Sequence, residues 1–418
     1  MKRKTCIFVI ISLLIVCTVP VMGLTNNNPD IYGPFVTGTT EKEAVISWMS
    51  NEQETFRLEY TKEPLSGSWH RQNSTVVGDG IYRVLLSDLT PATTYHYRIG
   101  TPHKISPGYQ FRTFGDDEFT FIIYGDTRAQ RPFFTQMERH RLVAERIASE
   151  PDLLFVIHTG DFINDHEADT DGWNEFFHVA EPYLSGTTLI PTIGNHDGPP
   201  GRFRDIFGIP EWYSVDAGGV HLIVLDSNDW AWPVMDEQTE WLRSELTGPA
   251  TWRIISFHHP PHTSDRRHPG GNLAIRNQWG QLFDSHGVDM VVSAHVHAYE
   301  RYIINNTQYI VIGTGGAPTY SLTEEKEDGH ITSLEHTLGY LRIAVTEETM
   351  TAAFVPVARI SPDNKDILEI YPEGTTFEMF TLSQESKAVE APSGGWIAVA
   401  ALLTAICIFV RTNRSEKR

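Results

Sequence analysis

Five apolar segments in the chain each end in side chains that can bind a metal ion. The segments are short and rich in Ile, Leu, Val and Phe, as buried β-strands are. Their end residues supply carboxylate, amide-oxygen and imidazole donors, which suit Zn, Mn or Fe, and no thiolate is among them. Along the chain, the end residues are Asp126, Asp161, Asn195 with His196, His258, and His295 with His297.

The place of these residues at strand ends favours one shared site. In open α/β sheets, the binding crevice lies beyond the carboxyl ends of the strands, so side chains there can converge. Taken singly, each has an ordinary explanation: Asp126 can cap a helix, Asn195 can favour a turn, and His258 can be a hydrogen-bonded core group. One metal site accounts for all five ends better than five separate accidents do.

Two donors, His295 and His297, stand two residues apart after the apolar run MVV at 290–292. If the strand continues through them, their side chains share a face and could reach one ion or two adjacent ions. The alternative is a pair of polar residues at the frayed end of a strand. The four earlier strand ends favour the metal interpretation.

The elements around these residues predict an α/β domain over 119–357. FTFIIYGD reads as a strand, PFFTQMERHRLVAERIASE as a helical stretch and DLLFVIHTGD as a second strand. LGYLRIAVT and TAAFVPVAR predict two more strands beyond Thr337. The glycine-rich IGTGGAP (312–318) lacks a following amphipathic helix, so we expect a turn at the site's rim rather than a dinucleotide site. Residues 358–393, with Pro and Glu, are expected to form an extension or stalk.

The region 29–113 predicts an all-β sandwich. AVISWMS and TYHYRIG alternate apolar and polar residues, and turn residues separate such segments. The stretch LSDLTPATTYHYRI resembles the late strands of a fibronectin type III domain, which implies a corner formed by Tyr95 and a buried Trp48. Nothing in this region suggests catalysis, so we expect a spacer or packing domain.

The two ends of the chain predict targeting segments. Residues 1–23 combine a basic start, an apolar stretch and a small-residue cleavage point, as a secretory signal peptide does. Residues 394–410 are apolar and uncharged, and the basic tail 411–418 follows, which predicts a transmembrane helix with the globular part extracellular or periplasmic. The region between the two ends has no cysteine and hence no disulfide. The three cysteines are Cys6, Cys17 and Cys407.

The charge balance limits the kinds of partner. The chain has 33 basic and 53 acidic residues and a formal net charge of −20. Such a surface repels nucleic acid at long range, so we expect no nucleic-acid coating role. A small anionic substrate can still be drawn to a local cationic site.

The motifs that carry the candidate ligands resemble those of a known family. YGDTR, HTGDFIN, GNHD, SFHHPPH and AHVHAYER are similar, in order, to the five motifs of the calcineurin-like metallophosphoesterases. AHVHAYER is most similar to the purple acid phosphatase branch, in which a fibronectin-like domain precedes the catalytic one. The resemblance implies two packed β-sheets flanked by helices, and two metal ions. It also implies that Asp161 bridges the ions, that Asn195, His258 and His295 complete one, and that Asp126 and His297 hold the other.

The resemblance also implies a reaction. Two ions can activate a hydroxide that attacks phosphorus in line. His196 is similar to the histidine that protonates the leaving oxygen, and Asp197 is a candidate to orient it. Arg128 and His268 are candidates for phosphate contacts; alternatively, Arg128 could begin a helix and His268 could be an ordinary loop residue.

Two positions depart from the family pattern. Purple acid phosphatases have a colour-giving tyrosine three residues after the bridging aspartate, where this chain has Asn164. Other metallophosphoesterases have a histidine two residues after the first aspartate, where this chain has Arg128. The ion at Asp126 and His297 therefore lacks an obvious further ligand, which Asn164 or water would have to supply. We expect a colourless enzyme.

The sequence thus predicts a membrane-anchored, extracytoplasmic phosphoesterase with two metal ions, favouring phosphate monoesters. One alternative is a phosphodiesterase or nucleotide hydrolase of the same fold, which differs in the room left for a second ester arm. Another is a decayed cell-surface protein whose sandwich binds a partner. Metal content and turnover of simple esters discriminate between these hypotheses.

Overall fold

The computed structural model describes residues 31–51, 54–65, 67–78, 80–165 and 171–385. The predicted signal peptide 1–23 and the predicted membrane segment 394–410 lie outside these residues. Within the described residues, none of the helices combines the length and apolar character that a bilayer crossing requires.

The N-terminal strands form a β-sandwich, as predicted. One sheet has the order β1-β2-β6-β5 and the other the order β4-β3-β7-β8. Trp48 is fully buried between them, and the Tyr95 hydroxyl accepts a hydrogen bond from the Thr90 amide at 2.9 Å, which makes the expected corner. The strands are β1 (Ile31–Thr37), β2 (Ala44–Ser50), β3 (Arg57–Thr61), β4 (His70–Asn73), β5 (Thr75–Val77), β6 (Ile81–Leu86), β7 (Thr94–Gly100) and β8 (Tyr109–Arg112).

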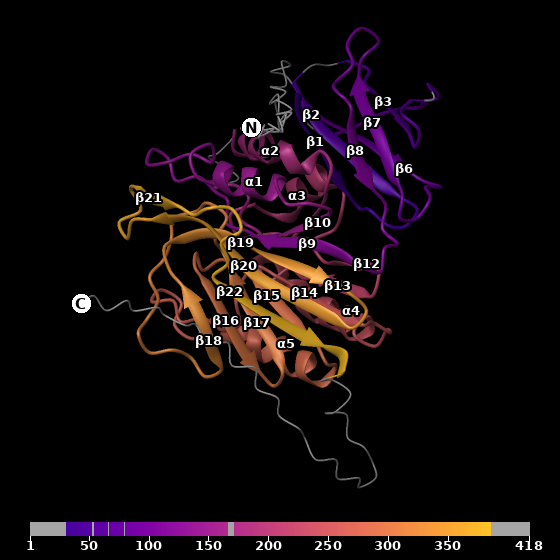
Figure 1. The fold of residues 1–418 in the computed structure, drawn as a ribbon. Helices are drawn as coiled ribbons and strands as arrows, with labels where there is room; N and C mark the ends of the chain where they lie inside the picture. The colour runs from indigo at the N-terminus through magenta and orange to yellow at the C-terminus, as the bar shows by residue number, and fades with distance from the viewer. Residues whose placement is uncertain (1–30, 52–53, 66, 79, 166–170, 386–418) are drawn as a thin grey trace, which may run out of the picture.

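The rest of the described chain contains two packed sheets with helices on their outer faces, as predicted (Figure 1). One sheet includes β20-β19-β9-β10-β11 and the other has the order β12-β13-β14-β15-β17-β16-β18, with an apolar layer between them. The strands are β9 (Phe119–Tyr124), β10 (Leu153–His158), β11 (Thr188–Pro191), β12 (Tyr213–Ala217), β13 (Val220–Val224), β14 (Trp252–Ser256), β15 (Met290–Ser293), β16 (Tyr299–Ile304), β17 (Thr307–Ile312), β18 (His330–Leu334), β19 (Thr337–Val345) and β20 (Thr349–Ile360).

The helices cover these sheets through apolar faces. Three pack on the first sheet, around a cluster that contains Phe176 and Phe207, and two pack on the second around Trp279. The helix predicted from PFFTQMERHRLVAERIASE begins only at His140, because turns occupy the residues before it. The helices are α1 (His140–Ala148), α2 (Gly172–Leu184), α3 (Pro200–Phe207), η1 (Asp229–Val234), α4 (Met235–Glu245) and α5 (Leu273–Ser285).

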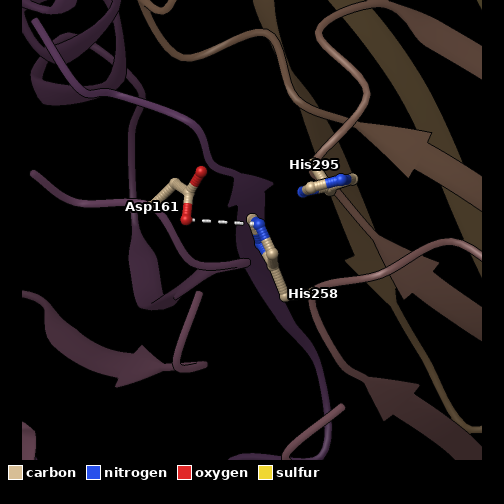
Figure 2. A group of neighbouring side chains, drawn as sticks. All are labelled: Asp161, His258 and His295. Carbon is tan, nitrogen blue, oxygen red and sulfur yellow. Dashed lines mark ion pairs between the residues drawn. The ribbon is translucent and has the colours of Figure 1, made fainter. Parts of the chain in front are cut away.

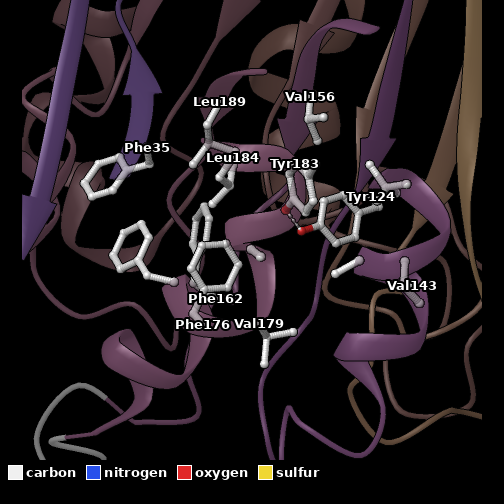
Figure 3. Packing of buried hydrophobic residues seen from close by; sticks show 14 of the residues in the cluster. Phe35, Tyr124, Val143, Val156, Phe162, Phe176, Val179, Tyr183, Leu184 and Leu189 are labelled. Carbon is white, nitrogen blue, oxygen red and sulfur yellow. Dashed lines mark hydrogen bonds between the residues drawn. The ribbon is translucent and has the colours of Figure 1, made fainter. Parts of the chain in front are cut away.

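The sandwich is continuous with the α/β domain, so of the two expected roles it fits a packing domain and not a spacer. Strand β1 pairs in parallel with β11 through Val36 and Thr188, so one sheet runs through both domains. The hydroxyls of Thr39 and Thr188 lie 2.7 Å apart beside this pairing. Phe35 of β1 stacks on Phe177 of α2 with ring centroids 4.2 Å apart, and it lies against the same core as the α/β residues (Figure 3).

Polar contacts extend the join between the domains. The Arg83 guanidinium donates to the carbonyls of Asp205 and Ile206 at 2.6 and 2.8 Å, at the carboxyl end of α3. A cation stabilises this end of a helix because free carbonyls point there. Gly208 follows with φ of 74°, and a Cβ on it would lie 2.7 Å from the Arg83 guanidinium. Glycine is thus needed at this position for both reasons.

The C-terminal segment differs from the expected extension. Strands β21 (Ile367–Ile370) and β22 (Glu378–Ser383) both pair antiparallel with β20, so the segment adds to the main sheet. Glu378 also forms an ion pair with Arg301 at 2.5 Å. Residues 358–385 are therefore part of the folded domain, and only the remainder of the predicted stalk lies outside the described residues.

Candidate metal centre

The carboxyl ends of the five predicted strands meet where the two sheets come together. Strands β9, β10 and β11 of the first sheet lead to Asp126, Asp161 and Asn195, and β14 and β15 of the second lead to the histidines. Two groups of metal-binding side chains result, each with one ligand atom per residue within 4.8 Å of the others. The groups are Asp161, His258 and His295, and Asp126, Asp161 and His297, so Asp161 belongs to both.

The first group points its lone pairs at a common space. His258 donates its Nδ1 proton to the Thr159 carbonyl at 2.9 Å, which leaves Nε2 as the acceptor. This Nε2 lies 3.2 Å from Asp161 Oδ1 and 3.1 Å from Asn195 Oδ1. His295 Nδ1 lies 2.9 Å from the same Asn195 oxygen. Figure 2 shows the two imidazoles and the carboxylate facing one another. Such a set of acceptors fits a cation.

The second group contains a buried oxygen without a hydrogen-bond partner. Asp126 is fully buried, and its Oδ1 accepts no hydrogen bond within the described residues. His297 donates from Nδ1 to the Pro318 carbonyl, so its Nε2 faces this oxygen at 3.1 Å. The other Asp126 oxygen accepts the amide proton of His295 at 2.9 Å. A buried carboxylate oxygen is costly to leave unpaired, so this group also fits a cation.

The electrostatics of the first group demand a positive charge. Burial raises the pKa of Asp161, but His258 and other neighbours outweigh burial and hold it well below its usual range. Burial lowers the pKa of His258, yet Asp161 raises it to about 9 overall. Burial holds the pKa of His295 well below its usual range, so this imidazole stays neutral. A proton or a metal ion must therefore accompany the Asp161 carboxylate.

Three of the ligand residues have left-handed backbone conformations. The φ angles of Asp126, Asp161 and His295 are 56°, 57° and 63°. Non-glycine residues in such regions cost roughly 1–3 kcal/mol each and cluster at functional sites. A Cβ on Gly194 would lie 2.2 Å from the Asp161 amide, so the neighbouring loops pack too closely for a side chain there. Packing therefore holds the ligand loops in strained positions.

The histidine pair lies in a turn, which corrects the strand-based prediction. Strand β15 ends at Ser293 and β16 begins at Tyr299, so His295 and His297 follow the strand rather than continue it. They do not share a strand face, yet the turn directs one to each donor group. His295 has a positive φ of 63° within this turn.

His196 lies at the edge of the first group. Its Nδ1 donates to the Asn164 carbonyl, and its Nε2 lies 3.8 Å from Asp161 Oδ2. The side chain is 32% exposed, so a substrate oxygen can reach Nε2. Its orientation comes from Asn164, which the sequence does not indicate.

Asp197 has another role than orienting His196. Its buried carboxylate accepts the amide protons of Asp161, Phe162 and Gly194 at 3.0, 2.8 and 2.7 Å. Burial, followed by the Asp161 charge, raises the pKa of Asp197 to about 8. Among the described residues, no hydrogen bond joins Asp197 to the His196 ring. Asp197 instead fixes the loop that carries Asp161.

Arg128 and Asn164 contact each other. Arg128 donates from a terminal nitrogen to the Asn164 side-chain oxygen at 3.0 Å, and its Nε lies 3.6 Å from Asp161 Oδ2. The helix that Arg128 could begin is not formed there. The Asn164 side-chain oxygen is thus used by Arg128, and among the described residues no hydrogen bond joins it to Asp126 or His297.

His268 approaches the first group from a loop. Its Nδ1 donates to Asp265 Oδ2 at 2.8 Å, and its ring centroid lies 4.7 Å from that of His295. Sequence reasoning found His268 but missed Asp265, which is buried beneath it. It also missed Tyr320, whose ring stacks on His297 at 4.1 Å. Tyr320 lies two residues past the glycine-rich stretch, and no motif marks it.

Comparisons with known protein families agree with this arrangement. Residues 119–299 match the calcineurin-like phosphoesterase family, and residues 34–113 match the N-terminal domain of purple acid phosphatases. Purple acid phosphatase 15 of Arabidopsis thaliana is 25% identical over 303 residues, covering 59% of this chain and 56% of the relative. Phosphoenolpyruvate phosphatase of Allium cepa is 25% identical over 320 residues, covering 60% and 63%. The chain thus spans little more than half the length of these curated relatives.

Solved structures show the same fold. The purple acid phosphatase PPD1 from yellow lupin (Lupinus luteus) seeds has a TM-score of 0.71 at 18% identity, covering 91% of this chain and 79% of its own. PhoD has a TM-score of 0.66 at 12% identity, covering 85% and 90%. At these identities, the likeness is one of fold.

Proposed function

We propose that this chain, which joins a calcineurin-like phosphoesterase domain to a purple acid phosphatase N-terminal domain, hydrolyses phosphate monoesters at a two-metal centre. The observation that carries the proposal is the Asp161 carboxylate, which two donor groups share. A shared carboxylate is what two neighbouring ions need in order to act on one phosphoryl group.

The residues divide between the two ions as the donor groups do. His258, His295 and the Asn195 oxygen would hold one ion, and Asp126 and His297 the other. When bound, such ions activate water and stabilise charge on phosphoryl oxygens. Asn164 stands where purple acid phosphatases have their tyrosine, and its oxygen accepts a hydrogen bond from Arg128. We therefore propose that the iron-loaded protein lacks the visible charge-transfer band of an iron–tyrosinate bond.

The remaining side chains act on the substrate. As an imidazolium, His196 can give its Nε2 proton to the leaving oxygen, because its other nitrogen is held by the Asn164 carbonyl. Arg128 lies beside Asp161 and His268 beside His295, so both can contact phosphoryl oxygens held at the donor groups. Asp197 supports them all by fixing the Asp161 loop.

We also propose that the enzyme is exported and anchored. The support is the composition of residues 1–23 and 394–410, which predict a signal peptide and a membrane segment. N-terminal sequencing of the mature protein and protease accessibility on intact cells would test this. A mature protein that starts at Met1 would contradict it.

A metal and activity assay tests the catalytic proposal. The purified protein should bind two ions per chain and hydrolyse a simple monoester faster than a diester. His258→Ala should lose at least one ion and about 100-fold or more in kcat, since a ligand is removed from a charge-stabilising centre. His178→Ala, in which an exposed histidine of α2 is replaced, should leave both unchanged.

Each outcome bears on a different hypothesis. If His258→Ala fails to fold, Asn195→Ala removes a ligand at a half-buried position and replaces it as the test. Faster turnover of the diester would favour a phosphodiesterase. If the metal-loaded protein hydrolyses neither ester, the phosphoesterase hypothesis is refuted. The hypothesis of a catalytically decayed cell-surface binding protein then remains.

A further inference from the structure

Three side chains form a stack that leads from the site's rim to the second donor group. The Tyr320 ring packs on the His297 imidazole with centroids 4.1 Å apart and planes at 29°. The Arg267 guanidinium lies 4.0 Å from the centre of the same Tyr320 ring. Tyr320 is 9% exposed, whereas Arg267 is exposed. One aromatic ring therefore separates an exposed cation from a candidate metal ligand.

A buried carboxylate fixes the loop that carries Arg267. The carboxylate of Asp265, which is 1% exposed, accepts the amide protons of Arg267 and His268 at 3.0 and 3.1 Å. The same oxygen accepts the His268 ring proton at 2.8 Å. The preceding Arg266 points elsewhere, because its Nε donates to the Leu322 carbonyl at 3.1 Å. The position of Arg267 is thus set by its backbone and by the Tyr320 ring.

The Arg267 charge is not neutralised by the protein. Within the described residues, its guanidinium forms no ion pair and no hydrogen bond, and it lies over the Tyr320 ring. Arg128, in contrast, is engaged by Asp161 and Asn164. A ring holds a guanidinium in place without cancelling its charge or using its hydrogen-bond donors. The donors of Arg267 are therefore available to an anion beyond the phosphoryl group.

We propose that Arg267 is a specificity-determining residue that binds a second anionic group on the alcohol part of the substrate. The preferred substrates are then phosphate monoesters whose leaving group carries a carboxylate or a further phosphate. A guanidinium binds both groups as a planar fork. The inference rests on the proposed phosphomonoesterase function and deepens it.

Three matched esters test the inference on the full-length enzyme. They are propyl phosphate, 3-phosphonooxypropanoate and propane-1,3-diyl bisphosphate, which differ in a neutral, a carboxylate and a phosphate end. We expect kcat/KM for at least one anionic ester to be about 10- to 100-fold higher than for propyl phosphate. A gain of this size is what hydrogen bonds to a charged group provide, and it should appear mainly as a lower KM. The two anionic esters separate the carboxylate from the phosphate as the natural source of the second charge.

Variants of the two neighbouring arginines supply the controls. Arg267→Gln should remove the preference and leave turnover of propyl phosphate within about twofold, while Arg267→Lys should keep part of it, because charge remains without the fork. Arg266→Gln changes the charge equally one residue away and should keep the preference. An equal loss in both glutamine variants, or a preference that survives Arg267→Gln, would overturn the inference.

A binding measurement separates this inference from the proposed function. Calorimetry uses propylphosphonate and 3-phosphonopropanoate, neither of which can be hydrolysed. The compound with the added carboxylate, 3-phosphonopropanoate, should bind more tightly than propylphosphonate to the wild type but not to Arg267→Gln. If no ester is hydrolysed yet this difference is found, the catalytic proposal fails and the anion site stands. If the esters are hydrolysed without any preference, the catalytic proposal stands and the anion site fails.

Discussion

At the scale of single residues, His196 depends on one backbone carbonyl. Its Nδ1 proton is donated to the Asn164 carbonyl, and its Nε2 lies 3.8 Å from Oδ2 of the buried Asp161. A histidine held in this way presents one defined nitrogen to a substrate. Its expected contribution is to proton transfer and not to metal binding.

Replacement of His196 by alanine should therefore slow chemistry selectively. We expect kcat for an alkyl phosphate to fall about 10²–10⁴-fold, which is the usual contribution of a positioned acid. The loss should be much smaller for 4-nitrophenyl phosphate, whose leaving oxygen needs no proton. Metal content, measured by mass spectrometry, should not change. Equal losses for both esters would contradict the assignment.

The candidate ligands could be predicted from the sequence, whereas their supporting residues could not. Asp126 and His258 follow apolar runs that are visible in the sequence. Tyr320 becomes part of the site only because its loop meets that of His297 in space, and Asp265 does so through a hydrogen bond to His268 three residues later, which no motif marks. Asp197 adjoins His196 in sequence, which suggested a partnership, but its carboxylate turns to another loop. Sequence adjacency does not determine where a buried side chain points.

At the scale of elements, prediction succeeded where apolar runs were long and failed where pairing was distant. Strands such as β9 and β10 are buried on both faces and read as continuous apolar runs. All four residues of β21 are exposed and β22 is partly exposed, so neither strand carries the buried apolar run that marks β9 and β10. They are strands because β20 offers both of them a partner edge, and such tertiary pairing outweighs weak local preference.

The contact between α2 and β8 contains a carboxyl group with a shifted pKa. Glu181 accepts a hydrogen bond from the Tyr109 hydroxyl at 3.5 Å across the domain join. Burial raises the pKa of Glu181 to about 7, and the hydrogen bond only partly opposes this. The folded protein therefore binds this proton more tightly than the unfolded chain does.

This shift predicts how stability depends on pH. The folded-state pKa lies above the unfolded value of about 4.3, so the contribution of Glu181 is fully present below pH 4.3 and is lost as pH rises through about 7. Glu181→Gln should be more stable than the wild type at pH 8, by roughly 1 kcal/mol after allowance for solvent screening, and equal to it near pH 4.5.

Urea unfolding at the two pH values, with constant metal content, measures the difference. Glu145→Gln, which replaces an exposed carboxylate on α1, should show no such pH dependence. A Glu181→Gln variant that is less stable at pH 8 would contradict the assigned direction.

At the scale of the whole molecule, the sandwich and the α/β domain share one sheet and one core. Phe35 belongs to β1 of the sandwich, yet its side chain lies in the cluster formed by α2 and the main sheet. The ring is fully buried and stacked on Phe177. The two domains should therefore unfold together.

Phe35→Ala tests this coupling. We expect a loss of about 3–5 kcal/mol, as for large buried aromatic residues, and a single calorimetric transition in both the wild type and the variant. Leu85→Ala, at a half-exposed position of β6 in the same sandwich, should cost far less. Two separate transitions, with only the sandwich affected, would show that the domains fold independently.

The pairing of β1 with β11 also affects what would happen to the α/β part alone. Without residues 31–113, β11 becomes an outer strand of its sheet, and the backbone edge that pairs with β1 is uncovered. Exposed apolar edges of this kind pair with other chains. We therefore expect the N-terminal sandwich to keep copies of this chain from adding to one another edge to edge.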